Sequence, residues 1–372
     1  MFKKLIFFIC LFPLLSSFAT RNFDGNLRQT YNFNSDWKLQ IGDISGAEAT
    51  SFSDESWSKI TLPHAFNEDE AFRVPIAELT DTVMWYRKHF RLPASDTDKK
   101  VFIEFEGVRF GAEIFVNGEK VGLHENGVMA FGFDITDKVK FNQDNVIAVR
   151  VDNNWKYHER ATNSTYQWNN NNFNANYGGI PKNVFLHVTG KVYQTLPLYS
   201  MLKTTGTYIY ASDFNIKAKK AVIHAETEIR NETSKAQKVT LEVMVEDMNN
   251  KEIGRFSGTE TLINPNETSI LNTSKLMSDL HFWSWGYGYL YNIYTVLKID
   301  GKPLDVVKNR TGFRKTKFKN GMVYLNDRVI QMKGYAQRTS NEWPGVGMSV
   351  PAWLSDYSNG LMVESNANMV RW

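Results

Sequence analysis

The chain has 372 residues, of which 42% are hydrophobic and 14% aromatic, so it can bury substantial cores and is not expected to be disordered. Its length predicts two or three domains. The formal net charge is only +3 and the basic residues form no stripe, which argues against a nucleic-acid partner.

The N-terminus has the pattern of a signal peptide. A basic start at Lys3 and Lys4 precedes a mostly apolar run that is too short to span a membrane comfortably. Small residues at Ser17 and Ala19 predict cleavage after Ala19, so residues 1–19 would be removed. The single cysteine, Cys10, lies in this run. We therefore expect a disulfide-free exported bacterial protein, periplasmic or secreted, without a stable membrane anchor.

Residues 27–190 have the pattern of short β-strands. Apolar residues at every second position from Val101 predict a half-buried strand. Asn117 and Gly118 supply the positive φ angles of a tight hairpin turn. Short strands separated by Pro- and Gly-containing turns predict a two-sheet sandwich or jelly roll.

An asparagine-rich segment, residues 168–177, carries six Asn between aromatic residues. These amides need hydrogen-bond partners, so the segment is not expected to form a core strand. Two interpretations stay open. It is either a polar surface loop or a sugar-contacting loop, because amides both donate to and accept from hydroxyl groups while an aromatic ring covers a sugar face.

Residues 191–311 contain further alternating strands, at 222–229, 239–245 and 290–299. Their number and spacing predict an immunoglobulin-like sandwich without its disulfide. The aromatic phrase around Trp283 and Trp285 is either a ligand platform or packing at a strand start. We assign no chemistry to this domain.

Residues 312–372 differ from the preceding domains, because their sequence predicts a helix as well as strands. Asn326 and Asp327 predict a small hairpin, and Ile330, Met332 and Gly334 predict a following strand. A helix is expected to begin at Pro351, because Trp353, Leu354, Tyr357, Leu361 and Met362 recur at helical spacing. Asn366 would cap this helix and residues 368–371 would form a second strand.

Several phrases occur in a fixed order: Asp36-Trp37, residues 57–64, residues 85–90, Gly107-Val108 with residues 116–118, and residues 177–184. Together with Thr311-Gly312-Phe313-Arg314 they resemble glycoside hydrolase family 2, the β-galactosidase and β-glucuronidase group. The resemblance implies a mainly β chain with a jelly-roll sugar-binding-like domain (27–190), an immunoglobulin-like sandwich (191–311) and the first βα units of a TIM (β/α)8 barrel (312–372). It implies the N-terminal part of an exported retaining β-glycosidase that acts on a carbohydrate.

The same resemblance names candidate substrate-binding residues. The segment before Gly178 reaches towards the active site in the family, which implies sugar contacts from Asn172, Asn174, Asn176 and Tyr177. Arg371 matches an arginine on the floor of the active site, although a purely structural barrel arginine is the alternative. Arg338 replaces a substrate-lining histidine of the family. This departure implies a shifted specificity, towards an acidic or unusual sugar.

No catalytic residue is expected within this chain. A retaining glycosidase uses two carboxyl groups, and both catalytic Glu of the family follow later barrel strands, beyond Trp372. Glu342 follows Asn341 but comes too early in the barrel, and Glu364 is expected to be a solvated helix residue. The seven His are scattered, so no metal and no cofactor are expected. The alternatives are a non-catalytic carbohydrate-binding or adhesive module, or a degraded gene product.

Overall fold

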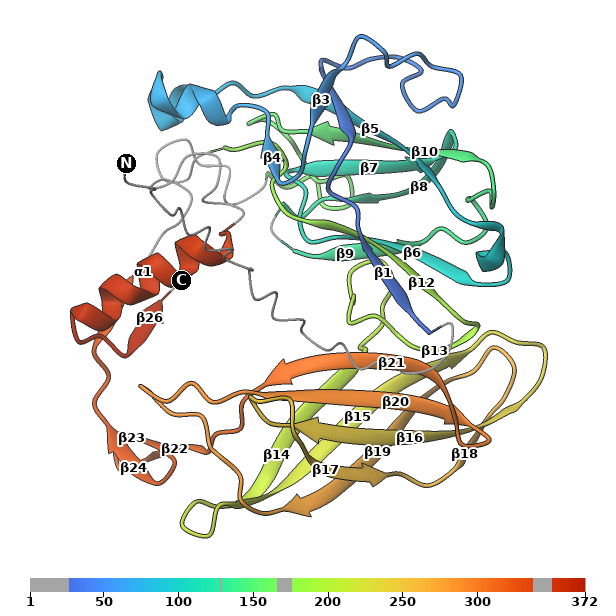
Figure 1. Cartoon of the computed structure of the whole chain (residues 1–372). Coiled ribbons are helices and arrows are strands. Elements are labelled where there is room, and N and C mark those ends of the chain that lie inside the picture. The colour runs from blue at the N-terminus through green and yellow to red at the C-terminus, as the bar shows by residue number, and fades with distance from the viewer. Residues whose placement is uncertain (1–26, 128, 166–175, 337–349, 372) are drawn as a thin grey trace, which may run out of the picture.

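A computed structural model describes residues 27–127, 129–165, 176–336 and 350–371. The fold is mainly β, with two sandwiches packed one on the other and a smaller C-terminal unit beside them (Figure 1). No helix in these described ranges combines the length and the apolar character needed to cross a membrane.

The first sandwich contains two antiparallel sheets. One has the order β1 (Gln29–Asn32), β12 (Val184–Thr189), β6 (Lys100–Phe105), β9 (Phe131–Asp134). The other has the order β3 (Ser58–Ile60), β2 (Trp37–Ile41), β5 (Val83–Arg91), β10 (Asp144–Asp152), β7 (Gly111–Val116), β8 (Glu119–His124). The short pair β4 (His64–Ala65) and β11 (Gly179–Ile180) lies apart, and the 3-10 helices are η1 (Glu68–Phe72), η2 (Ile76–Glu78) and η3 (Ala94–Asp96).

The core of this sandwich forms because alternate residues of both sheets face inward. It includes Trp37, Tyr86, Ile103, Ile114 and Phe131. The predicted hairpin is confirmed, since Asn117 (φ 52°) and Gly118 (φ 85°) connect β7 to β8. The strand predicted from Val101 is also present as β6, but it is buried on both faces rather than half-buried. Phe102 on its outer face packs against Tyr193, Leu196 and Leu198, which come from the connection to the second sandwich.

The second sandwich is immunoglobulin-like. In one sheet β15 (Lys220–Asn231) pairs with β13 (Val192–Gln194), β14 (Thr207–Asn215) and β19 (Thr268–Met277). The other has the order β17 (Glu252–Ser257), β16 (Gln237–Glu246), β20 (Tyr291–Ile299), β21 (Lys302–Thr311), with β18 (Thr261–Ile263) also on β16. The inward residues include Ile223, Ala225, Val243, Val245 and Ile293.

The C-terminal unit has two parts. The strands β22 (Thr316–Lys319), β23 (Met322–Leu325) and β24 (Arg328–Ile330) form an antiparallel sheet. The strands β25 (Gly334–Ala336) and β26 (Met369–Arg371) are parallel, with helix α1 (Ala352–Glu364) between them in sequence. The prediction that Ile330 and Met332 share the strand of Gly334 is wrong. Ile330 pairs with Val323 in the small sheet, because the β23–β24 hydrogen-bond ladder that follows the Asn326-Asp327 turn extends through Ile330.

Helix α1 ends as predicted. Asn366 has φ 60°, the left-handed conformation that closes many helices. Its N–H donates to Val363 O (2.9 Å), and the Ala367 N–H donates to Met362 O (2.9 Å). These two bonds form a Schellman motif, so the last turn of the helix has its carbonyl groups satisfied and the chain turns sharply into β26.

Candidate functional site

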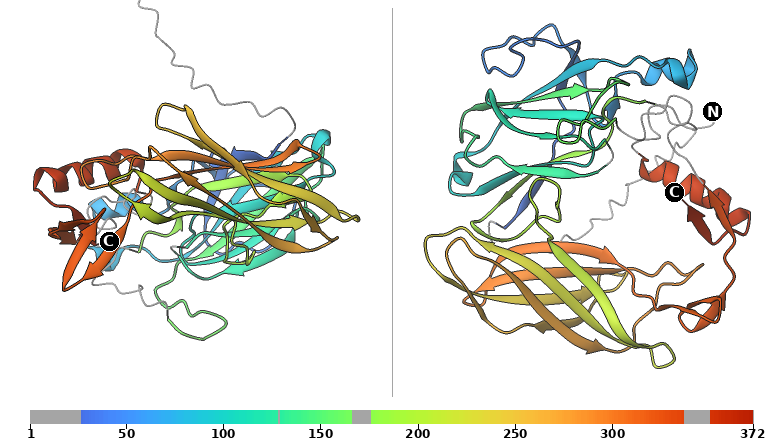
Figure 2. Two further views of the ribbon diagram at one scale, coloured as in Figure 1. Left: turned by 90° about the horizontal axis from the view of Figure 1, so that it is seen from below. Right: turned by 180° about the vertical axis from the view of Figure 1, so that it is seen from behind.

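Two segments far apart in sequence lie at the same end of the molecule. One is the edge of the first sandwich around β4, β11 and η1, and the other is the pair β25 and β26 with helix α1 (Figures 1 and 2). The sequence-predicted site residues that the structure describes all lie in these two segments. We therefore consider them together as the candidate site.

The β4–β11 edge depends on two glycines. A Cβ on Gly179, which has φ +124°, would lie 2.2 Å from the Tyr86 hydroxyl oxygen and 2.9 Å from His64 O. A Cβ on Gly178 would lie 2.2 Å from Asn153 Nδ2. All three distances are well below van der Waals contact, so only glycine allows the backbone to approach so closely here.

Three buried asparagines hold the chain next to these glycines. Asn67, Asn153 and Asn176 are almost completely inaccessible to solvent. Asn67 Nδ2 donates to Asn176 O (2.8 Å) and Thr80 O (3.0 Å), while Asn67 Oδ1 accepts from Gly178 N (3.2 Å). Asn176 Nδ2 donates to Asn153 O (3.0 Å), and Asn153 Nδ2 donates to Asn176 O (3.2 Å). This amide cluster fixes the backbone at Asn176, where the described chain resumes.

We expect the variant Asn67→Ala to be less stable by about 2–3 kcal/mol, because it removes three hydrogen bonds and leaves buried backbone groups without partners. Chemical denaturation of the purified chain measures this change. The control Asn249→Ala removes an exposed turn side chain and should change stability by less than about 0.5 kcal/mol. Equal stability of the two variants would contradict a structural role for the amide cluster.

Three titratable groups of this edge, Tyr86, His64 and Glu68, have pKa values that burial shifts towards the neutral form. Burial raises the pKa of Tyr86 well above its usual value. The Tyr86 hydroxyl lies 3.3 Å from His64 Nδ1. Burial lowers the pKa of His64, although the charge of Asp69 opposes the shift. Burial and the charge of Asp69 raise the pKa of Glu68.

Of the predicted sugar-contacting residues, Asn176 and Tyr177 are described and both are buried, with exposed fractions of 0% and 1%. Asn176 is bonded within the amide cluster, and Tyr177 packs with Ala65, Leu79 and Val74. Neither side chain forms part of the described surface. Asn172, Asn174 and Arg338 lie outside the described residues, as does Glu342. Sugar contact by these residues stays a prediction.

Arg371 lies exposed at the end of β26, and its register partner on β25 is Ala336. The two strands are parallel, so both carboxyl ends meet at this edge, and β/α barrels place their active sites at that edge. Leu354 is the buried residue of helix α1, whereas Trp353, Tyr357 and Leu361 are exposed. Glu364 is exposed, as predicted. Arg371 thus has the position that a barrel-floor arginine would need.

Sequence reasoning missed Asn67 and Asn153. Asn153 directly follows strand β10, and an amide at a strand end is a weak signal for a buried hydrogen-bonding role. Nothing in the sequence indicated a buried role for Asn67, because its hydrogen-bond partner Asn176 is 109 residues away in sequence. Over the ranges that the structure describes, no group of three or more His, Cys, Asp or Glu side chains is arranged to hold a metal ion.

Two family models match the chain. Residues 57–187 match the model described as glycosyl hydrolase 2 galactose-binding domain-like, and residues 207–314 match the model of glycosyl hydrolases family 2. Among curated proteins, a β-glucuronidase of Formosa agariphila is 36% identical over 93% of this chain, which covers 36% of that protein. The β-galactosidase BoGH2A of Bacteroides ovatus is 28% identical over 77% of this chain, which covers 32% of it.

Solved structures agree with these matches. A β-glucuronidase from glycoside hydrolase family 2 superposes with a TM-score of 0.85 at 34% identity, over 93% of this chain and 36% of that chain. A protein described as a putative β-galactosidase from Bacteroides fragilis superposes with a TM-score of 0.76 at 26% identity, over 93% of this chain and 50% of that chain. The chain thus spans about a third of the length of the two curated relatives.

Proposed function

Because this chain belongs to glycoside hydrolase family 2, we propose that it forms the N-terminal part of an exported retaining β-glycosidase that hydrolyses O-glycosidic bonds in a β-galactoside or β-glucuronide. The observation that carries the proposal is the likeness to a β-glucuronidase structure over 93% of the chain, at a TM-score of 0.85 and 34% identity. The apolar N-terminal run with small residues at Ser17 and Ala19 supports export.

Each part of the chain has a proposed role in that enzyme. In the proposed enzyme, the amide cluster of Asn67, Asn153 and Asn176 fixes the backbone next to Tyr177, beside the segment that the family resemblance assigns to sugar contact. The second sandwich joins the first sandwich to the C-terminal unit. Arg371 provides a fixed positive charge on the floor of the active site, where it would orient a carboxylate.

The chain by itself is proposed to lack turnover. Retaining hydrolysis needs an acid/base carboxyl group and a nucleophilic carboxylate about 5–5.5 Å apart. A β/α barrel assembles such a site from loops that follow many of its eight strands. The described residues contain one parallel pair of this kind, β25 and β26. Substrate binding and positioning are therefore the functions proposed for the residues present here.

To test this, the 372-residue chain can be produced with its own N-terminus in a bacterial host and recovered from the periplasm. We expect the mass of the recovered protein to be that of a chain beginning at Thr20. We also expect it to release no more nitrophenol from nitrophenyl β-galactosides or β-glucuronides than an empty-vector preparation does. The Formosa agariphila β-glucuronidase serves as positive control for the assay. Steady product release that co-purifies with the chain would refute the absence of turnover, and an unprocessed N-terminus would refute export.

A further inference from the structure

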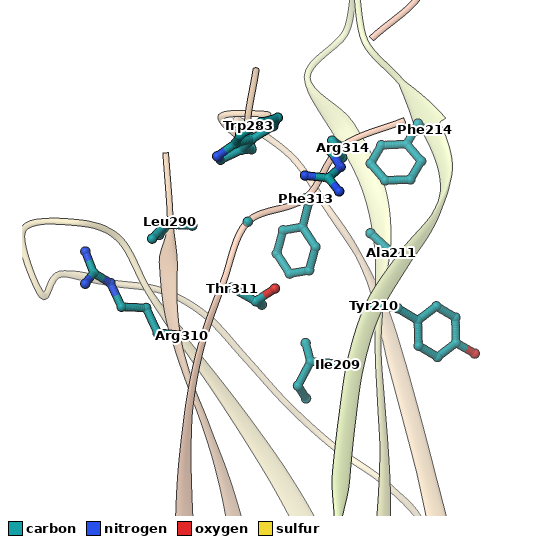
Figure 3. Close-up of a pocket in the computed structure, with 11 residues that line it drawn as sticks. Ile209, Tyr210, Ala211, Phe214, Trp283, Leu290, Arg310, Thr311, Phe313 and Arg314 are labelled. Atoms are coloured by element: carbon teal, nitrogen blue, oxygen red, sulfur yellow. The ribbon is translucent and has the colours of Figure 1, made fainter. Parts of the chain in front are cut away.

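A pocket of about 460 Å³ opens at the end of the second sandwich nearest the C-terminal unit (Figure 3). It belongs to neither segment of the candidate site. Strands β14 and β21 and the connection before β20 supply its walls. Its lining combines apolar and aromatic side chains with polar groups, among them two cationic side chains: Ile209, Tyr210, Ala211, Phe214, Trp283, Leu290, Arg310, Thr311, Gly312, Phe313 and Arg314.

The wall beside Trp283 is held in place by the backbone. Trp283 N donates to Phe313 O (2.8 Å), and Trp283 O accepts from Asn326 Nδ2 (3.0 Å). Phe313 is buried beneath the pocket. A Cβ on Gly312 would lie 2.8 Å from Tyr289 O and 3.0 Å from Trp283 Cβ, so glycine is needed for this close approach. The pocket is therefore preformed, and ligand binding would cost the protein little conformational entropy.

Arg314 is the polar group of this wall. Its guanidinium carbon lies 4.8 Å from the centre of the Trp283 ring, a cation–π distance. Figure 3 shows the guanidinium between Trp283 and Phe214, with Arg310 on the other side of Thr311. Stacking on an aromatic ring fixes the plane of a guanidinium and leaves its edge N–H groups free to bind a carboxylate in bidentate fashion.

The charge of this pocket is not balanced. Its lining includes two arginines and no acidic residue. Within the part of the chain that the structure describes, neither Arg310 nor Arg314 forms an ion pair or a side-chain hydrogen bond. Two arginines elsewhere on the same sandwiches are paired: Arg150 with Asp43, and Arg255 with Glu242 and Glu252. An unpaired cation over an aromatic wall is complementary to an anionic ligand.

We propose that this pocket is a binding site for a carboxylate-bearing sugar, with Arg314 holding the carboxylate and the apolar walls contacting the sugar ring. The size of the pocket is within the range of small-ligand sites and accommodates one or two sugar rings. A small inorganic anion would leave the aromatic and aliphatic walls unused. The inference concerns binding by the second sandwich and does not depend on the proposed glycosidase activity.

The matched probes are methyl β-D-glucuronide and methyl β-D-glucoside, which differ in the carboxylate. We expect calorimetric titration of the full chain to detect the glucuronide and to give at least about tenfold weaker binding of the glucoside, since a charged hydrogen-bonded pair distinguishes them. Arg314→Ala should weaken glucuronide binding about tenfold, and Arg314→Lys should recover part of the loss. Arg91→Ala removes an arginine of the first sandwich whose side chain is 60% exposed, away from the candidate site, and should change nothing.

Because Arg314 is exposed, we expect Arg314→Ala to keep the melting temperature of the parent chain, which shows that any loss of binding is local. Equal affinity for the two sugars, or an Arg314→Ala variant that behaves like Arg91→Ala, would overturn the proposal. N-acetylglutamate amide is the third probe. If it binds as tightly as the glucuronide and loses affinity equally in Arg314→Ala, the pocket recognises a protein carboxylate and the sugar assignment is wrong.

Discussion

Replacing Asp305 by asparagine is expected to lower the free energy of unfolding by about 3–5 kcal/mol, the cost of leaving one member of a buried ion pair without its partner. Asp305 is completely buried on β21, and Arg28 is 9% exposed. Asp305 Oδ1 accepts from Arg28 Nε (3.0 Å), and Asp305 Oδ2 accepts from Arg28 Nη2 (2.7 Å) and Gln194 N (2.8 Å). Arg28 also donates to Gln194 O.

This ion pair connects the two sandwiches, because Arg28 directly precedes β1 while Asp305 and Gln194 belong to the second sandwich. In urea denaturation, the unfolding curve of Asp305→Asn should therefore either split into two transitions or have its midpoint at a markedly lower urea concentration. The control is Asp144→Asn, which breaks an exposed ion pair with Arg91. The Asp144 side chain is 77% exposed and that of Arg91 is 60% exposed, so the substitution should cost less than about 1 kcal/mol. Similar midpoints for both variants would show that the Arg28–Asp305 pair does not stabilise the junction.

Asp54→Asn is the second substitution with a large expected effect, about 3–5 kcal/mol at neutral pH. Asp54 is buried and accepts three hydrogen bonds, from Lys38 Nζ (2.6 Å), Arg87 Nε (2.9 Å) and His89 Nε2 (2.8 Å). Arg87 is itself completely buried, and it also donates to Ala47 O and to Ala49 O (3.1 Å). Without the carboxylate, a buried guanidinium would lack its counter-charge.

The same group sets a pH dependence. Burial alone would raise the pKa of Asp54, but hydrogen bonds from Lys38, Arg87 and His89 lower it far below its usual range. The unfolded carboxyl group titrates at about 3.9, so its contribution is fully present above that pH and is lost as the pH falls towards the folded pKa. We expect the difference in stability between the parent chain and Asp54→Asn to be largest at neutral pH and to shrink below about pH 4.

Asp98→Asn is the control for this titration, because the Asp98 side chain is 98% exposed. Its stability should follow that of the parent chain at every pH. A constant difference between the parent and Asp54→Asn from neutral pH down to about pH 2 would contradict the assignment, because it would mean that the carboxylate does not carry the effect.

The features predicted correctly are those that depend on neighbours in sequence. The turn at Asn117-Gly118 and the helix end at Asn366 each follow from the backbone preference of one or two residues. The strand at residues 369–371 followed from the helix before it. The two-sided burial of β6 was missed because Phe102 is covered by Tyr193 and Leu196, residues about 90 positions later.

The candidate site shows the same limit. The resemblance pointed to Asn176 and Tyr177, but both side chains are buried. Asn176 is bonded by Asn153, and Tyr177 packs with Ala65 and Leu79, contacts that form only in the folded chain. The unpaired guanidinium of Arg314 is likewise invisible in sequence, since Arg314 and Trp283 come from separate segments. Residue identity indicated the chemistry available, and long-range packing decided which atoms can be reached.

The Arg28–Asp305 pair also has a consequence for the timing of synthesis. Its two members are 277 residues apart, and β1, next to Arg28, pairs only with β12 at residues 184–189. At about 5–20 residues per second, a ribosome would need about 15–55 s between Arg28 and Asp305. The segment around Arg28 is thus made well before its partner Asp305, and throughout that interval it stays available to chaperones.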